Sequence, residues 1–177
     1  MKAIRYLGHL LLGLALLGVA SCAQPSEPVA VETPAAPAAE LQLDRLVSGL
    51  LSCRPLPYAE ATRVIGPTGG VISLGPHRLY FPPGALAAPV AITAVAPSDS
   101  VNSVQLSPHG LQFEGWRKPL LTLSYRNCSL VGRLIPKRIV YTTDLLQILE
   151  VLLSFDNPLR SEVTAPLDHF SRYAVAW

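Results

Sequence analysis

Short runs of alternating hydrophobic and polar residues, separated by glycine and proline, fill the chain from Ala61 onward. In Leu120–Tyr125, for example, leucine and tyrosine side chains alternate with Thr122 and Ser124. This period of two is typical of a strand with one buried face. The same pattern predicts strands at Val71–Leu74, His77–Phe81, Val90–Ala96, Leu120–Tyr125, Arg138–Thr142, Leu145–Leu153, Glu162–Leu167 and Arg172–Trp177. Short strands with turn residues at intervals of about 8–12 residues predict an all-β fold, an antiparallel β-sandwich, over residues 61–177.

The apolar run Leu145–Leu153 leaves two interpretations open. It is either a buried strand or an exposed binding edge. Its side chains do not alternate cleanly around Gln147 and Glu150, so we expect a β-bulge there.

The first residues have the pattern of an export signal. Lys2 and Arg5 precede the apolar stretch Leu7–Val19, which is shorter than the roughly 20 residues of a transmembrane helix. We therefore predict a signal peptide over residues 1–21. The string Val19-Ala20-Ser21-Cys22 resembles the bacterial lipobox.

This resemblance implies a lipoprotein. The leader would be cut before Cys22, the Cys22 thiol would be diacylated, and the new amino terminus would be acylated. Several acyl chains on one residue give durable membrane binding, so the predicted partner of Cys22 is the lipid bilayer. The residue after Cys22 is Ala23 and not an aspartate, which resembles lipoproteins that are sent to the outer membrane. We expect a location in the bacterial cell envelope, at the periplasmic face of the outer membrane or at the cell surface. The alternative is a plain secretory signal with an incidental cysteine.

Two segments lie between Cys22 and the predicted sandwich. Residues 22–40 are rich in proline and alanine and contain no aromatic residue, so we predict a disordered, extended tether. Residues 41–60 are a lead-in segment. Within it, Leu41–Leu51 has leucines at helical spacing and is either a short docking helix or a further piece of tether.

Four strings in the order of one known family follow the lead-in. They are Val64–Val71 (VIGPTGGV), Leu79–Leu86 (LYFPPGAL) with Val90–Thr93 after it, Ser107–Phe113 (SPHGLQF) and Lys118–Leu123 (KPLLTL). Together they resemble a ZU5 domain over about Arg63–Tyr125. The resemblance implies a β-sandwich that serves protein–protein contacts and carries no cofactor. Gly69 and Gly70 suit a hairpin entry that needs positive φ, and Pro82-Pro83-Gly84 suits a corner where strand pairing stops.

Two cysteines remain once Cys22 is assigned to the lipid. In an oxidising envelope compartment, a disulfide between Cys53 and Cys128 is the expected state, and two free thiols are the alternative. Neither cysteine has the Cys-x-x-Cys or histidine spacing of a zinc site, so we expect no metal.

The string His169-Phe170-Ser171 resembles the self-cleavage site of some animal proteins that contain a ZU5 domain. By this resemblance Ser171 is the nucleophile, Phe170 provides the scissile carbonyl and His169 is the base. The alternative is structural: Phe170 lies in the core, His169 caps a turn and Ser171 opens the last strand. Only Ser171–Trp177 would be released by such a cut.

Composition and charge exclude several classes of function. The chain of 177 residues has 14 Lys and Arg against 12 Asp and Glu, and removal of Lys2 and Arg5 leaves it formally neutral. A neutral domain lacks the electrostatic footprint of a nucleic-acid-binding protein. Its histidines are scattered and Gly-x-Ser-x-Gly is absent, so we expect no enzyme activity beyond the self-cleavage hypothesis, and no cofactor.

The sequence therefore predicts a membrane-anchored lipoprotein that presents a binding or structural sandwich to a protein or a cell-wall component. The first alternative is a self-cleaving module. The second is a carbohydrate-binding sandwich, for which Trp116 and Tyr80 are the candidate platform residues.

Overall fold

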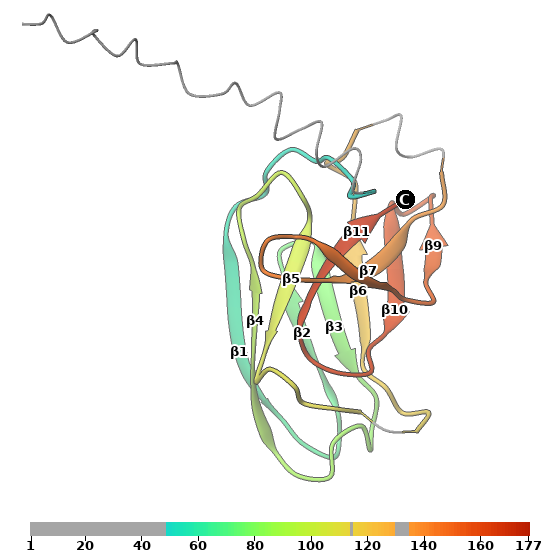
Figure 1. The fold of residues 1–177 in the computed structure, drawn as a ribbon. Coiled ribbons are helices and arrows are strands. Elements are labelled where there is room, and N and C mark those ends of the chain that lie inside the picture. Colours follow the sequence, from blue (N-terminus) through green and yellow to red (C-terminus); the bar gives the residue numbers. More distant parts are fainter. Residues whose placement is uncertain (1–48, 114, 130–134) are drawn as a thin grey trace, which may run out of the picture. The chain divides into compact units, whose positions relative to one another are not determined.

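Eleven strands form two antiparallel sheets in the part of the chain that the computed structural model describes, residues 49–113, 115–129 and 135–177 (Figure 1). The six-stranded sheet has the order β1 (Ala59–Ile65), β4 (Val90–Ala96), β5 (Ser103–Ser107), β11 (Arg172–Ala176), β7 (Arg138–Thr142) and β8 (Ile148–Val151). The five-stranded sheet has the order β2 (Gly70–Leu74), β3 (His77–Phe81), β6 (Leu120–Ser124), β10 (Glu162–Pro166) and β9 (Phe155–Asn157). The predicted antiparallel β-sandwich is confirmed.

The core lies between the two sheets because alternate side chains of each strand point inward. In β3, His77, Leu79 and Phe81 are buried, whereas Arg78 and Tyr80 are exposed. Aromatic rings fill one part of this core: Phe170 lies edge-on to Phe81, with ring centroids 6.1 Å apart, and the third ring is that of Phe113. The alternation that predicted the strands is therefore the alternation that builds the core.

A second, smaller apolar cluster lies on the outer face of the six-stranded sheet. Ala174 and Ala176 of β11 point away from the main core, yet both are buried. The residues that cover them include Leu50, Val140 and Leu146. Leu146 reaches this face from the turn between β7 and β8, where its φ is 61°. Both faces of β11 are thus covered.

The sandwich takes in residues before the predicted boundary at residue 61. Leu51 donates a backbone hydrogen bond to Val175, and Trp177 donates one to Gly49, so Gly49–Leu51 extend the ladder beside β11. None of these three residues is helical: Gly49 lies in a turn with φ 76°, and Leu50 forms an antiparallel bridge with Ala176. Leu41–Ser48 of the lead-in, and the predicted signal peptide, lipidated Cys22 and tether, lie outside the described residues.

Candidate binding surface

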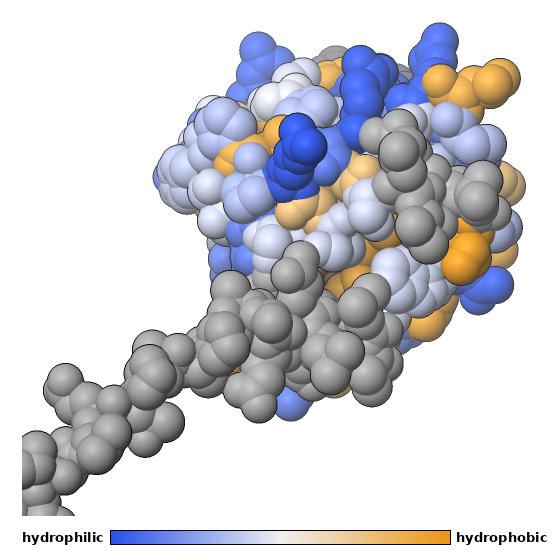
Figure 2. Space-filling view, turned by 90° about the horizontal axis from the view of Figure 1, so that it is seen from above, coloured by the Kyte–Doolittle hydropathy of each residue, from blue (hydrophilic) through white to orange (hydrophobic). Residues whose placement is uncertain are grey.

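The edge strands β8 and β9 present a series of large hydrophobic side chains to solvent. Each is the last strand of its sheet among the described residues. We call this surface the apolar edge and define it by Leu145, Leu149, Val151, Leu153, Phe155 and Leu159. Figure 2 shows hydrophobic atoms on the right of the molecule, the side on which Figure 1 places β9. Of the two interpretations of Leu145–Leu153, the structure selects the exposed edge: the exposed fraction is 84% for Leu145 and 77% for Leu153.

The expected bulge lies within β8. Glu150 pairs with Tyr141 and Ile148 pairs with Thr142, so Leu149 is the extra residue in the ladder. Val151 pairs with Val140 and shares its face, which is the outer face of the six-stranded sheet. A hollow of about 240 Å³ adjoins β8 on this face, and Ile148, Val151 and Trp177 contribute to its wall. The apolar edge therefore includes a concave part.

Asp156 holds the edge strand β9 to the core. Its Oδ1 accepts a hydrogen bond of 2.7 Å from the Tyr125 hydroxyl, and its Oδ2 accepts one of 2.9 Å from the backbone N–H of Lys137. The Lys137 side chain is also buried, and burial lowers its pKa while the nearby Asp156 carboxylate opposes that shift. Because Asp156 points inward, Glu150 is the one acidic or basic side chain of β8 and β9 that faces solvent.

The opposite edges, β1 and β2, carry a different surface. β1 exposes Glu60 and Arg63, and the Arg63 guanidinium donates a 2.8 Å hydrogen bond to the carbonyl of Val71 in β2. Charged side chains on an edge strand oppose pairing with another chain. One side of the sandwich is thus protected by charge, and the other, at β8 and β9, is not.

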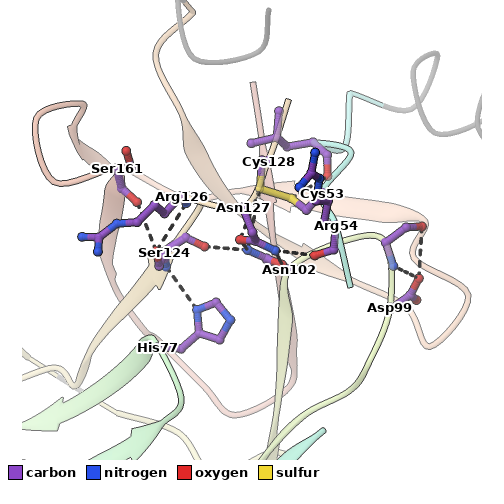
Figure 3. Close-up of a disulfide and its surroundings, with 12 residues drawn as sticks. Cys53, Arg54, His77, Asp99, Asn102, Ser124, Arg126, Asn127, Cys128 and Ser161 are labelled. Atoms are coloured by element: carbon purple, nitrogen blue, oxygen red, sulfur yellow. Dashed lines mark hydrogen bonds between the residues drawn. A yellow bond between two sulfur atoms is a disulfide. The ribbon is translucent and has the colours of Figure 1, made fainter. Parts of the chain in front are cut away.

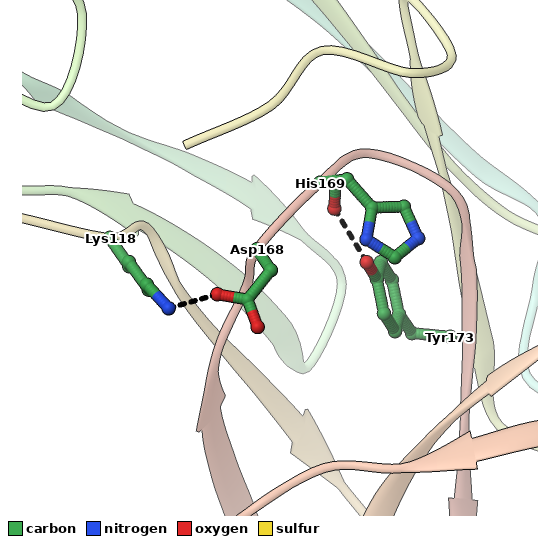
Figure 4. A network of polar contacts seen from close by, with 4 residues as sticks. All are labelled: Lys118, Asp168, His169 and Tyr173. Atoms are coloured by element: carbon green, nitrogen blue, oxygen red, sulfur yellow. Dashed lines mark hydrogen bonds and ion pairs between the residues drawn. The ribbon is translucent and has the colours of Figure 1, made fainter. Parts of the chain in front are cut away.

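The structure places the three residues of the self-cleavage hypothesis immediately before β11. Phe170 is a core residue with an exposed fraction of 1%, as the structural alternative expected. The His169 ring packs edge-on against Tyr141, with ring centroids 4.9 Å apart, and its backbone carbonyl accepts a 2.5 Å hydrogen bond from the Tyr173 hydroxyl (Figure 4). Nearby, Lys118 and Asp168 form an ion pair. Ser171 is partly buried.

Backbone hydrogen bonds hold both sides of the Phe170–Ser171 peptide. The Phe170 carbonyl accepts a 3.1 Å hydrogen bond from the Gly110 N–H, and the Ser171 carbonyl accepts a 3.0 Å hydrogen bond from the Leu106 N–H. Within the described residues, positive φ at a non-glycine position occurs at Leu146 and Ser161 and not at this peptide. The geometry supplies one donor to the scissile carbonyl but no left-handed strain.

The predicted disulfide joins Cys53 to Cys128 with an S–S distance of 2.01 Å (Figure 3). Beside it, the side-chain amides of Asn102 and Asn127 are paired, with Nδ2 to Oδ1 distances of 2.7 and 3.1 Å. Asn127 also donates a 2.5 Å hydrogen bond to the carbonyl of Arg54. Sequence reasoning missed this amide pair, because residues 25 positions apart meet only after β5 and β6 have formed.

The two candidate residues of the carbohydrate hypothesis differ in exposure. Trp116 is 83% exposed, and Tyr80 of β3 is 38% exposed. The Arg117 guanidinium lies 4.6 Å from the centroid of the Trp116 ring and covers one of its faces. Sugar rings stack on open aromatic faces, so this contact leaves Trp116 a single face for the purpose. The carbohydrate hypothesis stays a prediction.

The described residues contain no cluster of three or more His, Cys, Asp or Glu side chains able to hold a metal ion. In the same residues, no helix has the length and hydrophobicity needed to cross a bilayer. No model of a known protein family matches the chain, and no curated protein matches it either. The class that can be stated from the fold is that of a disulfide-bonded antiparallel β-sandwich.

Proposed function

We propose that the protein is a lipoprotein of the bacterial cell envelope, anchored through Cys22, whose ZU5-like sandwich binds a partner protein at the apolar edge. The observation that carries this proposal is the contrast between the two sides of the sandwich. The side chains of Leu153 and Phe155, beside β8 and in β9, are 77% and 69% exposed, whereas the exposed side chains of β1 include the charged residues Glu60 and Arg63. Exposed hydrophobic groups on unpaired edge strands are typical of interaction sites.

The partner that suits this surface is an extended segment with apolar side chains. An edge strand offers its outward backbone groups for strand addition, and alternate side chains give specificity. The bulge at Leu149 shortens the regular part of β8, so an added strand can form few backbone hydrogen bonds with it. We therefore expect burial of the Leu153 and Phe155 side chains to supply most of the binding free energy. A basic residue of the partner opposite Glu150 would complement the one charge that β8 and β9 expose.

Photo-crosslinking at the apolar edge tests this binding function. The full chain, carrying a photoreactive residue at Leu153, is expressed in the bacterium that produces it and irradiated. We expect a covalent adduct with one identified envelope protein, and we expect Glu150→Lys to reduce its yield. The control carries the same group at Val64, which is 69% exposed on β1 and should give no such adduct. Absence of an adduct from Leu153, or an equal adduct from Val64, contradicts the proposal.

The crosslink also shows whether the apolar edge binds a second copy of this chain. An adduct with the mass of two chains, together with concentration-dependent dimerisation in sedimentation, would mean that the apolar edge mediates self-association and does not bind a different protein. Leu153→Asp should then abolish the dimer.

Lipid anchoring is tested separately. Cells fed an alkyne-labelled fatty acid should incorporate the label into the full chain, and Cys22→Ser should remove both the label and the recovery in the membrane fraction. Label retained by the Cys22→Ser variant would contradict the assignment of the lipid to Cys22.

Self-cleavage between Phe170 and Ser171 is a second candidate function, and the contact that favours it is the hydrogen bond from Gly110 to the Phe170 carbonyl. In this reaction the Ser171 hydroxyl oxygen attacks the Phe170 carbonyl carbon, and His169 takes the hydroxyl proton. The Phe170–Ser171 C–N bond breaks as the Ser171 nitrogen is protonated, and water then hydrolyses the ester. The Gly110 N–H would stabilise the oxyanion.

Intact mass of the denatured protein tests the second candidate. Cleavage predicts loss of the Ser171–Trp177 peptide from the main mass, and Ser171→Ala should restore the full mass. A full mass for the unaltered chain after prolonged incubation would exclude self-cleavage.

A further inference from the structure

His77, at the start of β3, is a buried histidine with one ring nitrogen left without a protein partner. The side chain is 2% exposed, and its Nδ1 accepts a 3.1 Å hydrogen bond from the backbone N–H of Ser124. Because Nδ1 is the acceptor, the neutral ring carries its hydrogen on Nε2. In Figure 3 the second ring nitrogen points away from Ser124. Among the described residues, Nε2 has no hydrogen-bond partner, and it is not one of the fully enclosed atoms that lack a partner, so it can be reached from the adjoining hollow.

The ring of His77 forms part of the wall of a hollow of about 130 Å³ at one end of the sandwich. The remaining wall is mostly apolar: it comes from Leu56 and Pro57, from Leu74 at the end of β2, from Pro76 in the β2–β3 turn, and from Pro97 after β4. A cavity of roughly 150 Å³ is large enough to hold a benzene molecule. The hollow therefore has room for one small aliphatic side chain.

The other polar side chains of this wall already have partners. Asn102 is paired with Asn127 and also donates to the Ser124 carbonyl, and the Tyr58 hydroxyl donates to Glu60. The Ser103 hydroxyl accepts a hydrogen bond from Arg172. The Nε2–H of His77 is therefore a ring donor of the described wall with no acceptor within the protein, and the Ser103 hydroxyl, which accepts from Arg172, is a second wall donor without one. An acceptor atom on a ligand in the hollow could therefore pair with the Nε2–H of His77.

We propose that this hollow, the His77 pocket, binds an uncharged peptide segment that inserts an aliphatic side chain and places a backbone carbonyl oxygen on the Nε2–H of His77. An aliphatic group matches the leucine and proline wall. A carbonyl oxygen matches a neutral donor, and the described wall of this first hollow contains no positively charged side chain to favour a carboxylate, whereas Arg126 and Glu162 line only the second hollow. Sugars are disfavoured, because their several hydroxyls would lose water without gaining partners there.

A second hollow continues from the first, which fits an extended ligand. The two hollows share Leu56 and Pro76, and the second, of about 420 Å³, reaches Ser124 and Glu162. The peptide chain would leave the His77 pocket over Leu56 and Pro76. This site lies on elements other than β8 and β9, so the inference is independent of the apolar edge.

The test is an NMR titration of the full-length protein in detergent with N-acetyl-leucinamide as the probe. The 15N spectrum of the histidine rings should first show the His77 hydrogen on Nε2. Addition of the probe should then shift the His77 ring signals and the backbone signals of Leu56 and Pro97 neighbours in a saturable manner. N-acetylglucosamine and acetate, added in the same way, should not.

Two variants keep the test decisive. His77→Phe removes the donor and should weaken probe binding roughly tenfold, the effect expected for a lost hydrogen bond. Ala59→Phe leaves His77 in place but fills the hollow, since Ala59 contributes to its wall, and should abolish binding even if His77→Phe fails to fold. Leu153→Asp at the apolar edge is the matched control and should bind the probe as the unaltered chain does. A hydrogen on Nδ1, no saturable shift with N-acetyl-leucinamide, or unchanged binding by Ala59→Phe would overturn the proposal.

Discussion

The hydroxyl of Tyr125 donates a 2.7 Å hydrogen bond to Oδ1 of Asp156 and thereby joins the chain just after β6 to the edge strand β9. Asp156 pairs with Val163 of β10, and its side chain points from the edge toward the core. This contact fixes the strand that presents Phe155 on its other face. The rigidity of the apolar edge therefore depends on a polar contact beneath it.

Tyr125→Phe should lower the free energy of unfolding by about 1.5–3 kcal/mol, the range for a hydrogen bond to a charged group. The carboxylate of Asp156 would keep the Lys137 N–H as its partner, so we expect a folded variant. Urea unfolding followed by fluorescence measures the change. Tyr141→Phe, which removes a hydroxyl from a partly buried tyrosine of the same domain, is the control. An equal effect of both changes would show that the Asp156 contact contributes nothing specific.

Gly69→Ala should destabilise the domain far more than Gly75→Ala. Both glycines have positive φ, 75° and 55°, so each substitution costs about 1–2 kcal/mol for the left-handed backbone. A Cβ at Gly69 would also lie 2.3 Å from the backbone oxygen of Phe81, whereas a Cβ at Gly75 would meet nothing within 4 Å. Because backbone atoms cannot move aside cheaply, Gly69→Ala carries a steric cost in addition.

Thermal unfolding of the two glycine variants provides the comparison. The melting temperature should fall by a few degrees for Gly75→Ala, as about 1–2 kcal/mol implies for a domain of this size. Gly69→Ala should melt much lower or fail to fold. Equal melting temperatures would contradict the close approach of Gly69 to Phe81.

The stability of the domain should fall between about pH 6.5 and pH 4 because of His77. Burial lowers the pKa of His77 to about 4 from 6.5. As the pH falls through this window, the unfolded chain takes up a proton that the folded chain does not, so protonation favours unfolding. The loss from this one group amounts to about 3 kcal/mol when the pH reaches 4, and the contribution is fully present above pH 6.5.

Urea unfolding at several pH values checks this prediction. His77→Phe should remove the corresponding part of the pH dependence, even if it changes the stability at neutral pH. If the slope between pH 4 and 6.5 is the same with and without His77, the histidine is not the group responsible.

Reduction of the Cys53–Cys128 disulfide should lower the free energy of unfolding by about 4–5 kcal/mol on the chain-entropy model, given the sequence separation of 75 residues. The bond ties Gly49–Leu51 and the residues after them to the end of β6, so these segments should exchange their amide hydrogens faster after reduction. Urea unfolding with and without a reductant gives the energy, and intact mass shows two hydrogens gained. A Cys53→Ser and Cys128→Ser double variant as stable as the oxidised protein would contradict this estimate.

Local alternation determined much of this fold. His77–Phe81, Val90–Ala96 and Arg138–Thr142 are strands with the bounds that their sequence pattern predicts. In each strand, hydrophobic and polar residues alternate because successive side chains point to opposite faces of the sheet, and only one face lies against the main core. This pattern involves neighbouring residues alone, so the sequence is enough to predict it. The disulfide between Cys53 and Cys128 was also predicted from the sequence, because the expected assignment of Cys22 to a lipid leaves two cysteines, and an oxidising compartment was expected for them.

Three strands were not predicted, for reasons that differ. β1 (Ala59–Ile65) lies at an edge and exposes charged residues, so it has little apolar pattern. β5 (Ser103–Ser107) is short and flanked by polar residues, and β9 (Phe155–Asn157) has only three residues. Their pairing with longer strands stabilises them, and that stabilisation comes from residues distant in the sequence.

The candidate sites show the same division. The sequence by itself determined that Leu145–Leu153 is apolar and irregular, but both a buried strand and an exposed edge satisfy that pattern. Only the order of the strands decided between them, because β8 pairs on one side alone within the part of the chain that the structure describes. Likewise, the sequence showed His77 only as one of several scattered histidines. The structure places it after the β2–β3 turn, in the wall of a hollow, where its Nδ1 accepts a hydrogen bond and its Nε2 has no partner among the described residues. Exposure and hydrogen-bond partners depend on contacts between distant segments, and those contacts exist only in the folded chain.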